Sequence, residues 1–330
     1  MEQQYIGIDL HKASFHACAM RSDGTRLWEA AFPRTPEGLA TFAARGIEAA
    51  QLAVEATGPT WRFVDAVSAY GAHAHVVDPR KTKLKAGFAA KTDRLDARRL
   101  ADALRRESVV SIYVPPMAIR ELRELSRGRQ QVVRLRTKVV QAIRALLLRQ
   151  DVGDPPVRTL TSRAGLAWLS RVQLGPSSDG TLRRLERLLH VLHQEARAAD
   201  AAVQAAASDD PIAQALQQLA GVGPILSVVL RAEIGCIERF TRGAALASYA
   251  GIVPQVYASG TSYRTGRITR AGSPWLRWAL IEVAVKALKR PDPLGRWARR
   301  LAVQKGIKRA RVALARRLCD RIVRTWRQVG

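Results

Sequence analysis

The chain has 330 residues, 47% of them hydrophobic, and a formal net charge of +26 with a sequence pI near 11.3. No apolar run reaches the ~20 residues that a membrane span needs, and the N-terminal residues lack the basic start and apolar stretch of a signal peptide. Three widely spaced cysteines argue against a disulfide framework and against a zinc knuckle. We therefore expect a soluble, cytoplasmic protein of more than one domain.

The positive charge is concentrated in two segments. Residues 98–150 carry 13 Lys and Arg against 4 Asp and Glu, and residues 261–330 carry 19 against 3. Each neutralised phosphate releases condensed counterions, so such blocks are typical of proteins that bind nucleic acid. Membrane surfaces are also anionic, but these blocks hold few aromatic anchors, which favours nucleic acid over a bilayer.

Residues 1–110 alternate β-rich and helical segments. We predict strands at 5–9, 16–20, 27–32, 51–55 and 73–77, with a turn at 22–24 that joins the second and third strands in a hairpin. Helices are expected to begin at Pro36 and at Asp93, after the N-cap residues Thr35 and Thr92. Three strands able to pair antiparallel, followed by β–α repeats, predict an α/β domain with a mixed five-stranded sheet covered by helices.

The rest of the chain is predicted to be helical. Apolar residues recur at helical spacing from about 117 to 150, and a second stretch after Gly180 alternates steps of three and four, the seam of a coiled coil. The two stretches can pair antiparallel within one chain or between chains. From residue 211 on, we expect a Gly-rich turn at 219–224, a small-residue loop at 258–262 and Arg-rich helices. The Gly-rich turn either approaches a phosphate, as in a helix-hairpin-helix element, or serves packing alone.

Four acidic residues are candidate metal ligands. Asp9 ends the first predicted strand, Glu55 ends the fourth, and Asp93 and Asp96 share one helix face. If the two strands are neighbours and the helix packs across their ends, the carboxylates converge and repel one another unless cations neutralise them. Oxygen ligands favour Mg²⁺ or Mn²⁺, and two such ions can clamp the attacking and leaving oxygens of a phosphodiester. The alternative is four unrelated surface acids.

Three segments around these acids resemble the acidic motifs of the DEDD transposases, insertion-sequence recombinases with a RuvC-like, RNase H-type N-terminal domain. They are Tyr-Ile-Gly-Ile-Asp-Leu-His-Lys at 5–12, Val-Glu-Ala-Thr-Gly at 54–58 and Lys-Thr-Asp-Arg-Leu-Asp-Ala at 91–97. The likeness continues at 219–224, 247–254, 257–262 and 270–277. It implies a RuvC-like DEDD catalytic domain at 1–110, a helical coiled-coil region at 111–210 and a mostly helical C-terminal transposase domain at 211–330.

The same resemblance implies a nucleophilic serine, and Ser259 is the matching position. A hydroxyl with small neighbours can reach a backbone phosphorus, and metal coordination can activate it, because no histidine lies nearby in sequence. Without the resemblance, an ordinary Gly-Ser-Thr loop is the simpler interpretation. Five cationic residues are candidate phosphate contacts, although a solvated basic surface has the same composition: Lys12, Arg264, Arg267, Arg270 and Arg277.

The family further implies partners. Its members resemble one another in using a structured bridge RNA that pairs with donor and target DNA, and in acting as homo-oligomers, here a dimer or tetramer. A bacterial, nucleoid-associated protein is expected. Three functions remain open at this point: a recombinase that forms a phosphoserine–DNA intermediate, a junction-resolving RuvC-like nuclease in which water attacks, and a non-catalytic nucleic-acid scaffold.

Overall fold

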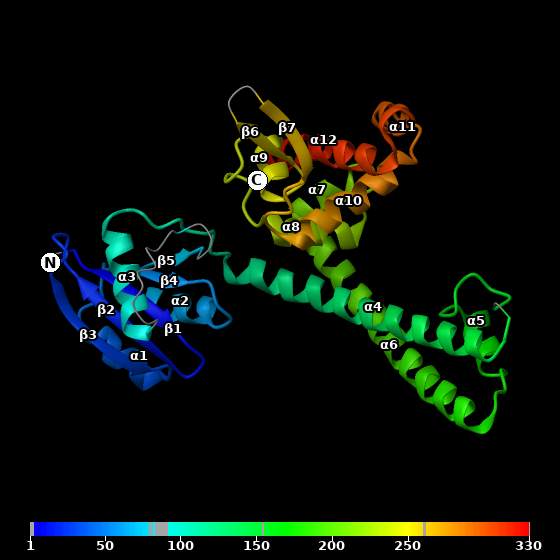
Figure 1. Ribbon diagram of the computed structural model, residues 1–330, viewed down its shortest axis with the longest axis horizontal. Coiled ribbons are helices and arrows are strands. Elements are labelled where there is room, and N and C mark those ends of the chain that lie inside the picture. Colours follow the sequence, from blue (N-terminus) through cyan, green and yellow to red (C-terminus); the bar gives the residue numbers. More distant parts are fainter. Residues whose placement is uncertain (1–2, 79–81, 83–91, 154, 260–261, 330) are drawn as a thin grey trace. The chain divides into compact units, whose positions relative to one another are not determined.

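The computed structural model describes residues 3–78, 82, 92–153, 155–259 and 262–329 (Figure 1). They form two compact units, an N-terminal unit up to Val114 and a C-terminal unit from Pro115 on. Within these described ranges, no helix combines the length and the apolar character needed to cross a bilayer.

The N-terminal unit is built on one five-stranded sheet in the order β3-β2-β1-β4-β5. Strands β1 (Tyr5–Leu10), β2 (Ser14–Met20) and β3 (Arg26–Pro33) pair antiparallel, whereas β4 (Gln51–Glu55) and β5 (His73–Val77) extend the sheet in parallel with β1. The short β2–β3 turn enforces antiparallel pairing, and the helices that precede β4 and β5 return the chain for parallel pairing. The expected mixed five-stranded sheet is confirmed.

Helices cover both faces of this sheet. One face packs against α1 (Pro36–Ala43) and α2 (Thr60–Ser68), and the other against α3 (Asp93–Arg105). Ile6 and Ile8 belong to the core under α1 and α2, together with a cluster of four phenylalanines. Because successive strand residues face opposite sides, the alternate residues Gly7 and Asp9 lie on the α3 side.

The C-terminal unit begins with two long helices. α4 (Met117–Arg149) and α6 (Pro176–Asp209) pack antiparallel within the chain, and α5 (Arg163–Leu169) lies between them in sequence (Figure 1). Ile143 near the end of α4 shares a buried cluster with Leu182 near the start of α6. The pairing is therefore intramolecular, while the supercoil of a coiled coil stays a prediction. α6 begins at Pro176, before the expected start at Gly180, because proline suits a first helical turn.

Six further helices share a second core in this unit. Leu230, Leu280 and Leu318 lie fully buried in it. The helices are α7 (Pro211–Gln217), α8 (Pro224–Ile234), α9 (Gly243–Tyr249), α10 (Pro274–Leu288), α11 (Pro293–Lys305) and α12 (Ile307–Arg327). The three-domain division of the chain stays a prediction.

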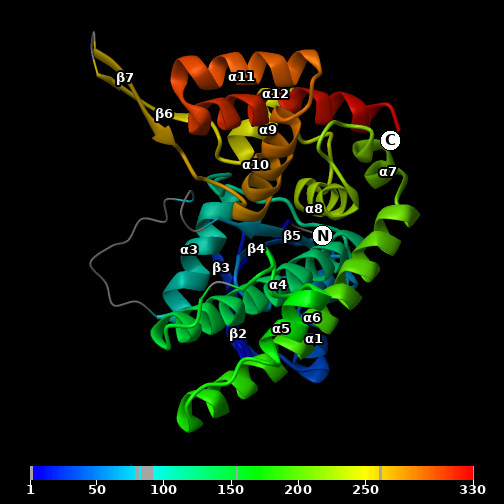
Figure 2. The same ribbon diagram turned by 90° about the vertical axis from the view of Figure 1, so that its right-hand side faces the viewer.

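A two-stranded hairpin, β6 (Pro254–Ser259) and β7 (Ser262–Ile268), stands away from these helices (Figure 2). The prediction of a loop at 258–262 was wrong for its described residues, because Ala258, Ser259 and Ser262 lie in strands; Gly260 and Thr261 are outside the described residues. Backbone pairing along the whole hairpin outweighs the low strand propensity of these small residues.

Candidate active site

Asp9 and Glu55 occupy neighbouring positions at the ends of two paired strands. β1 and β4 run parallel with Ile8 opposite Val54, so Asp9 and Glu55 are the next residues along each strand. Both belong to the set of residues on the α3 side of the sheet. The sequence left open whether the first and fourth strands are neighbours; the structure pairs them, and this brings two acidic residues to one edge of the sheet.

Gly7 allows α3 to pack directly on β1. A Cβ atom at Gly7 would lie 2.0 Å from the carbonyl oxygen of Ala97 and 2.4 Å from the amide nitrogen of Ala101. No side chain fits at such distances, so a glycine is required where the helix crosses the strand. The contact places the N-terminal half of α3 beside the last residues of β1.

The predicted cap fixes where α3 begins. The Thr92 hydroxyl accepts a hydrogen bond from Leu95 N at 3.3 Å, and the helix starts at Asp93. Asp93 and Asp96 therefore stand in its first turn, three positions apart on one side. The favourable field at a helix N-terminus also stabilises acidic residues there.

Two carboxylates and one imidazole lie close together where the end of β1 meets the start of α3. His11 Nε2 lies 3.4 Å from a carboxylate oxygen of Asp9 and 3.2 Å from one of Asp93. One ligand atom from each of the three residues lies within 4.8 Å of the other two. The side chain of Asp93 is 63% exposed and that of Asp9 is 23% exposed, so the group is open to solvent.

The electrostatics of Asp9 fit a cation-binding role. Burial raises the pKa of the Asp9 carboxyl, the electrostatic interaction with His11 lowers it, and the negative charges of Asp93 and Asp96 raise it; the net shift is upward. A divalent cation among these groups would relieve the repulsion, because each carboxylate is a preferred oxygen ligand of Mg²⁺ or Mn²⁺. The residues present therefore fit such an ion.

Asp96 and Glu55 have contacts of their own. The Asp96 carboxylate forms an ion pair with Arg99 Nη1 at 3.2 Å. The main-chain oxygen of Glu55 accepts a hydrogen bond from the Thr60 hydroxyl at 2.9 Å, which orders the turn after β4. Within the part of the chain that the structure describes, the compact ligand group holds Asp9, His11 and Asp93, so the full acidic quartet stays a prediction. His11 was not predicted as a ligand, although its position two residues after Asp9 was an available signal.

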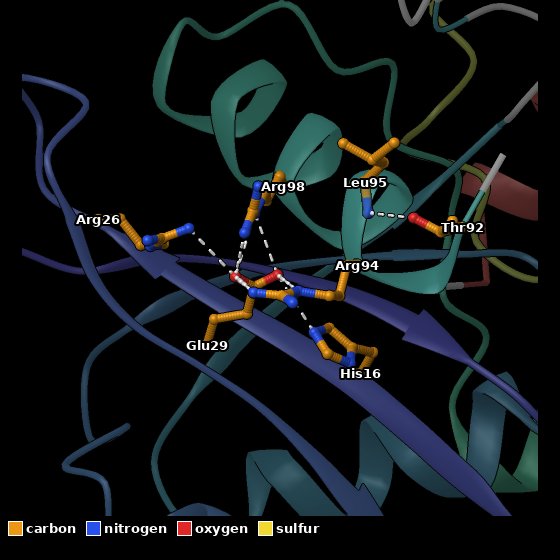
Figure 3. Close-up of polar contacts among 7 residues, drawn as sticks. All are labelled: His16, Arg26, Glu29, Thr92, Arg94, Leu95 and Arg98. Atoms are coloured by element: carbon orange, nitrogen blue, oxygen red, sulfur yellow. Dashed lines mark hydrogen bonds and ion pairs between the residues drawn. The ribbon is translucent and has the colours of Figure 1, made fainter. Parts of the chain in front are cut away.

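A buried carboxylate ties α3 to the sheet (Figure 3). The side chain of Glu29, on β3, is 6% exposed and forms ion pairs with Arg94 and Arg98 of α3, His16 of β2 and Arg26 of β3. The nitrogen–oxygen distances run from 2.5 Å for Arg98 to 3.3 Å for His16. Burial by itself would raise the pKa of Glu29, but hydrogen bonds from Arg98, Arg94 and His16 outweigh it and lower the pKa to about 2. Glu29 therefore stays ionised. No sequence motif marked it, since both of its partners on α3 are distant in the chain.

Ser259 is the last residue of β6, and its Cα partner in the hairpin is Ser262 of β7. The serine belongs to the C-terminal unit, whereas the four acidic residues belong to the N-terminal unit. The hairpin's own pattern of paired strands separated by two residues, one of them glycine, was the signal that would have predicted it. The nucleophilic role of Ser259 stays a prediction.

The five predicted phosphate contacts differ in their surroundings. Lys12, Arg264 and Arg267 are exposed, and Arg270 adopts a left-handed backbone with φ of 55° just after β7. Arg277 is half-buried and donates hydrogen bonds at 3.2 Å to two main-chain oxygens, one of them that of Arg270. Burial, with the charge of Arg270, lowers the pKa of Arg277. Arg277 thus braces the base of the hairpin, and the role of all five as phosphate contacts stays a prediction.

α12 presents a further basic surface, which we call the α12 basic face. It consists of six exposed arginines opposite the buried side of the helix: Arg309, Arg316, Arg317, Arg321, Arg324 and Arg327. Among the described residues, none of the six forms an ion pair with a carboxylate, and Asp320 is the one acidic residue in this helix. Composition predicted a basic C-terminal segment, but only the helix shows which of its residues share one side.

The Gly-rich turn before α8 is explained by packing. Gly221 has a φ of 89°, and a Cβ atom on it would lie 2.7 Å from the carbonyl oxygen of Val283 in α10. Gly223 precedes α8 and has open space around it. The packing interpretation therefore accounts for Gly221, and a phosphate contact at Gly223 stays a prediction.

Comparison with known proteins gives two matching family models. The model of DEDD transposases of IS110 elements, described as "Transposase", matches residues 6–150, and that of the "Transposase IS116/IS110/IS902 family" matches residues 213–299. The transposase of insertion sequence IS1111A from Coxiella burnetii is 26% identical over 94% of this chain and 86% of its own length. The transposase of IS1328 from Yersinia enterocolitica is 25% identical over 84% and 82%, respectively. A probable family 20 transposase from Pseudomonas aeruginosa is 28% identical over 68% and 69%.

Proposed function

This chain belongs to the DEDD transposases of the IS110/IS116/IS902 family, enzymes that cleave and rejoin DNA, and we propose that Asp9, Glu55, Asp93 and Asp96 hold the divalent cations of its reaction. The main support is the approach of Asp9 and Asp93 to one nitrogen of His11, from a strand end and a helix start. We also assign the N-terminal unit to the RNase H-like fold, which the family suggests and the mixed five-stranded sheet supports.

We propose Ser259 as the nucleophile. Its oxygen forms a bond to a backbone phosphorus, the bond from that phosphorus to a deoxyribose oxygen breaks, and the hydroxyl proton passes to the departing oxygen. The resulting phosphoserine linkage conserves a phosphate ester bond for the rejoining step. Mg²⁺ or Mn²⁺, when bound, would neutralise phosphate charge and lower the pKa of the attacking hydroxyl. The position of Ser259 at the end of β6, in a hairpin that stands away from the helices, supports this role (Figure 2).

Donor and target DNA, a guide RNA and further copies of the chain are the proposed partners. The supporting features are the basic segment at 98–150 and the α12 basic face, both suited to a polyanion. A protein that grips backbone phosphates leaves sequence recognition to base pairing, as guided systems do. The proposed assembly is a dimer or tetramer in which Ser259 of one copy acts with the acidic residues of another.

The acidic site is tested by Asp9→Ala and Asp93→Ala. Both variants should lose strand cleavage in Mg²⁺ while retaining DNA binding, because the ligands are removed and the basic surfaces are not. Asp23→Ala is the matched control, since Asp23 is an acid of the same unit in the β2–β3 turn, bonded to Thr25. Cleavage by Asp9→Ala at the wild-type rate would disprove the acidic site.

The serine is tested by a covalent adduct. Wild-type protein, Mg²⁺, guide RNA and matched DNA should yield a protein–DNA species on a denaturing gel that Ser259→Ala abolishes. Ser262→Ala, the residue across the hairpin, should leave it intact. Cleavage by Ser259→Ala without an adduct would instead establish water as the nucleophile, and the absence of any metal-dependent cleavage would establish a non-catalytic scaffold.

A further inference from the structure

The first turn of α3 lacks the apolar anchoring of the later turns. The buried residues of this helix begin at Ala97 and continue through Leu100 and Leu104. Asp93 and Arg94 are exposed and Leu95 and Asp96 are half-buried, so the first turn of α3 contributes no fully buried side chain of its own. The turn that carries two proposed metal ligands is held by polar contacts, namely the Thr92 cap and the ion pairs to Glu29.

Glu29 grips α3 at two points on one side. Arg94 and Arg98 are four residues apart and lie one above the other. Arg94 Nε is 3.2 Å from Oε1 of Glu29, and Arg98 Nε is 3.1 Å from both carboxylate oxygens (Figure 3). Asp93 and Asp96 stand on an adjacent side of the same turn. Because Glu29 contacts the helix at two side chains, it fixes the rotation of this turn about the helix axis. That rotation sets the direction in which both aspartate side chains point.

Glu29 also forms ion pairs with two cationic side chains that lie next to the proposed metal ligands in the chain. Arg94 directly follows Asp93, and Arg98 is two residues after Asp96. Arg99 already pairs with Asp96 at 3.2 Å, which shows that a guanidinium of this helix reaches these carboxylates. Guanidinium groups released from Glu29 would compete with a metal ion for the same oxygens.

We propose that Glu29 is a positioning residue of the metal site. It acts through Arg94 and Arg98, holding the first turn of α3 so that Asp93 and Asp96 remain available to a divalent cation. This inference rests on the proposed function, because it takes the two aspartates as metal ligands. Glu29 itself contacts neither aspartate in the described ion pairs.

The test uses the full chain with Glu29→Gln, which keeps the shape of the side chain and removes its charge. The free Mn²⁺ signal in an EPR titration gives the metal affinity, and the Mg²⁺ dependence of DNA cleavage gives the activation constant and the maximal rate. We expect Glu29→Gln to weaken Mn²⁺ binding by about tenfold, the lower end of the effect seen when groups behind metal ligands are removed. The maximal rate at saturating Mg²⁺ should stay within about twofold, because such a change acts on occupancy rather than on the chemical step.

Asp102→Asn is the matched control. Asp102 also pairs with two arginines of α3, Arg105 at 2.5 Å and Arg106 at 3.1 Å, but at the far end of the helix. The Asp102→Asn variant should leave the Mn²⁺ affinity unchanged. Arg94→Gln removes one of the two ion pairs between Glu29 and α3. The Arg94 side chain is 63% exposed, so this variant should fold and keeps the test valid if Glu29→Gln does not fold. Like Glu29→Gln, the Arg94→Gln variant should bind Mn²⁺ more weakly than wild type.

A readout without metal completes the test. Amide hydrogen exchange at residues 93–96 should accelerate in Glu29→Gln and not in Asp102→Asn. Unchanged Mn²⁺ affinity in folded Glu29→Gln, or in Arg94→Gln if the former does not fold, overturns the inference, and so does an equal loss in Asp102→Asn. If Asp9→Ala abolishes Mn²⁺ binding while Glu29→Gln does not alter it, the proposed function stands and only this inference falls. If wild type and Asp9→Ala bind Mn²⁺ alike, the metal site itself is wrong.

Discussion

Asp9 and Asp93, distant in the chain, place carboxylate oxygens 3.4 Å and 3.2 Å from the same atom, Nε2 of His11. One aspartate comes from the end of a central strand and the other from the start of a helix packed on that strand. Because two carboxylates approach this one nitrogen atom, the space between them is a point of negative potential. The same point suits a divalent cation. Four predictions test this site, the packing around it and the α12 basic face.

Asp9→Asn should stabilise the metal-free protein at neutral pH and abolish its stabilisation by Mg²⁺. Burial and like charges raise the pKa of Asp9 in the folded state above its ordinary value of 3.8, so ionising it costs folding free energy. That cost is absent below pH 3.8, grows as the pH rises through the folded-state pKa, and is complete above it. Thermal unfolding in EDTA and in Mg²⁺ between pH 3.5 and 7 measures the difference. A variant less stable than wild type in EDTA at pH 7 contradicts this account.

Gly7→Ala should destabilise the N-terminal unit by about 3 kcal/mol, the upper range for overpacking, because the new methyl group meets the backbone of α3. It should also weaken Mn²⁺ binding, since displacement of α3 moves Asp93. Gly58→Ala is the control, with nothing within 4 Å of its added Cβ. Urea unfolding of both variants gives the comparison, and equal stabilities would rule out the close approach of helix and strand.

Glu29 should contribute stability that depends on pH. Its folded-state pKa of about 2 lies below the ordinary 4.5, so its contribution is fully present above pH 4.5 and is lost as the pH falls toward 2. A lowering of this size corresponds to roughly 3 kcal/mol at neutral pH. The difference in unfolding free energy between wild type and Glu29→Gln should therefore shrink from pH 5 to pH 2.5. A difference that stays constant over this range shows that the carboxylate charge is not what stabilises the fold.

The α12 basic face should contribute to nucleic-acid affinity by neutralising backbone phosphates. Replacing Arg316, Arg321 and Arg324 by Gln should lower the slope of log affinity against log salt by up to roughly 3, because each duplex phosphate that is no longer neutralised reduces the slope by about 0.9. Asp320→Asn, on the same face, should raise affinity because it removes the one opposing charge. Fluorescence anisotropy with a DNA duplex and an RNA duplex at several salt concentrations measures both. An unchanged slope shows that nucleic acid binds elsewhere on the protein.

The sheet and the cap of α3 could be predicted because their causes are local. Alternating β-rich runs and the turn at 22–24 define the strands, and the Thr92–Asp93 pair marks the helix start, where the hydroxyl accepts the bond from Leu95 N. Whether the first and fourth strands pair was only a condition for the acidic residues to converge, and the parallel register of β1 and β4 meets that condition.

Two features were not predicted from the sequence: the β6–β7 hairpin and the pairing of α4 with α6. Ser259 and Ser262 lie in paired strands although small polar residues indicated a loop, because the pairing of the two strands outweighs the low strand propensity of small residues. The heptad pattern of α4 and α6 left the pairing open, since an apolar stripe fits any complementary stripe; a shared cluster with Ile143 and Leu182 settled it.

By itself the sequence determined the acidic residues, the element that carries each of them, and the basic character of the C-terminal segment. These follow from periodicity, capping and charge, which act over a few residues. Only the tertiary structure decided that His11 stands between Asp9 and Asp93, that Glu29 grips α3 through Arg94 and Arg98, and which arginines of α12 share one side. The reason is physical: these relationships depend on the close approach of α3 to the sheet at Gly7 and on which side of α12 is buried, and neither is a property of any short segment.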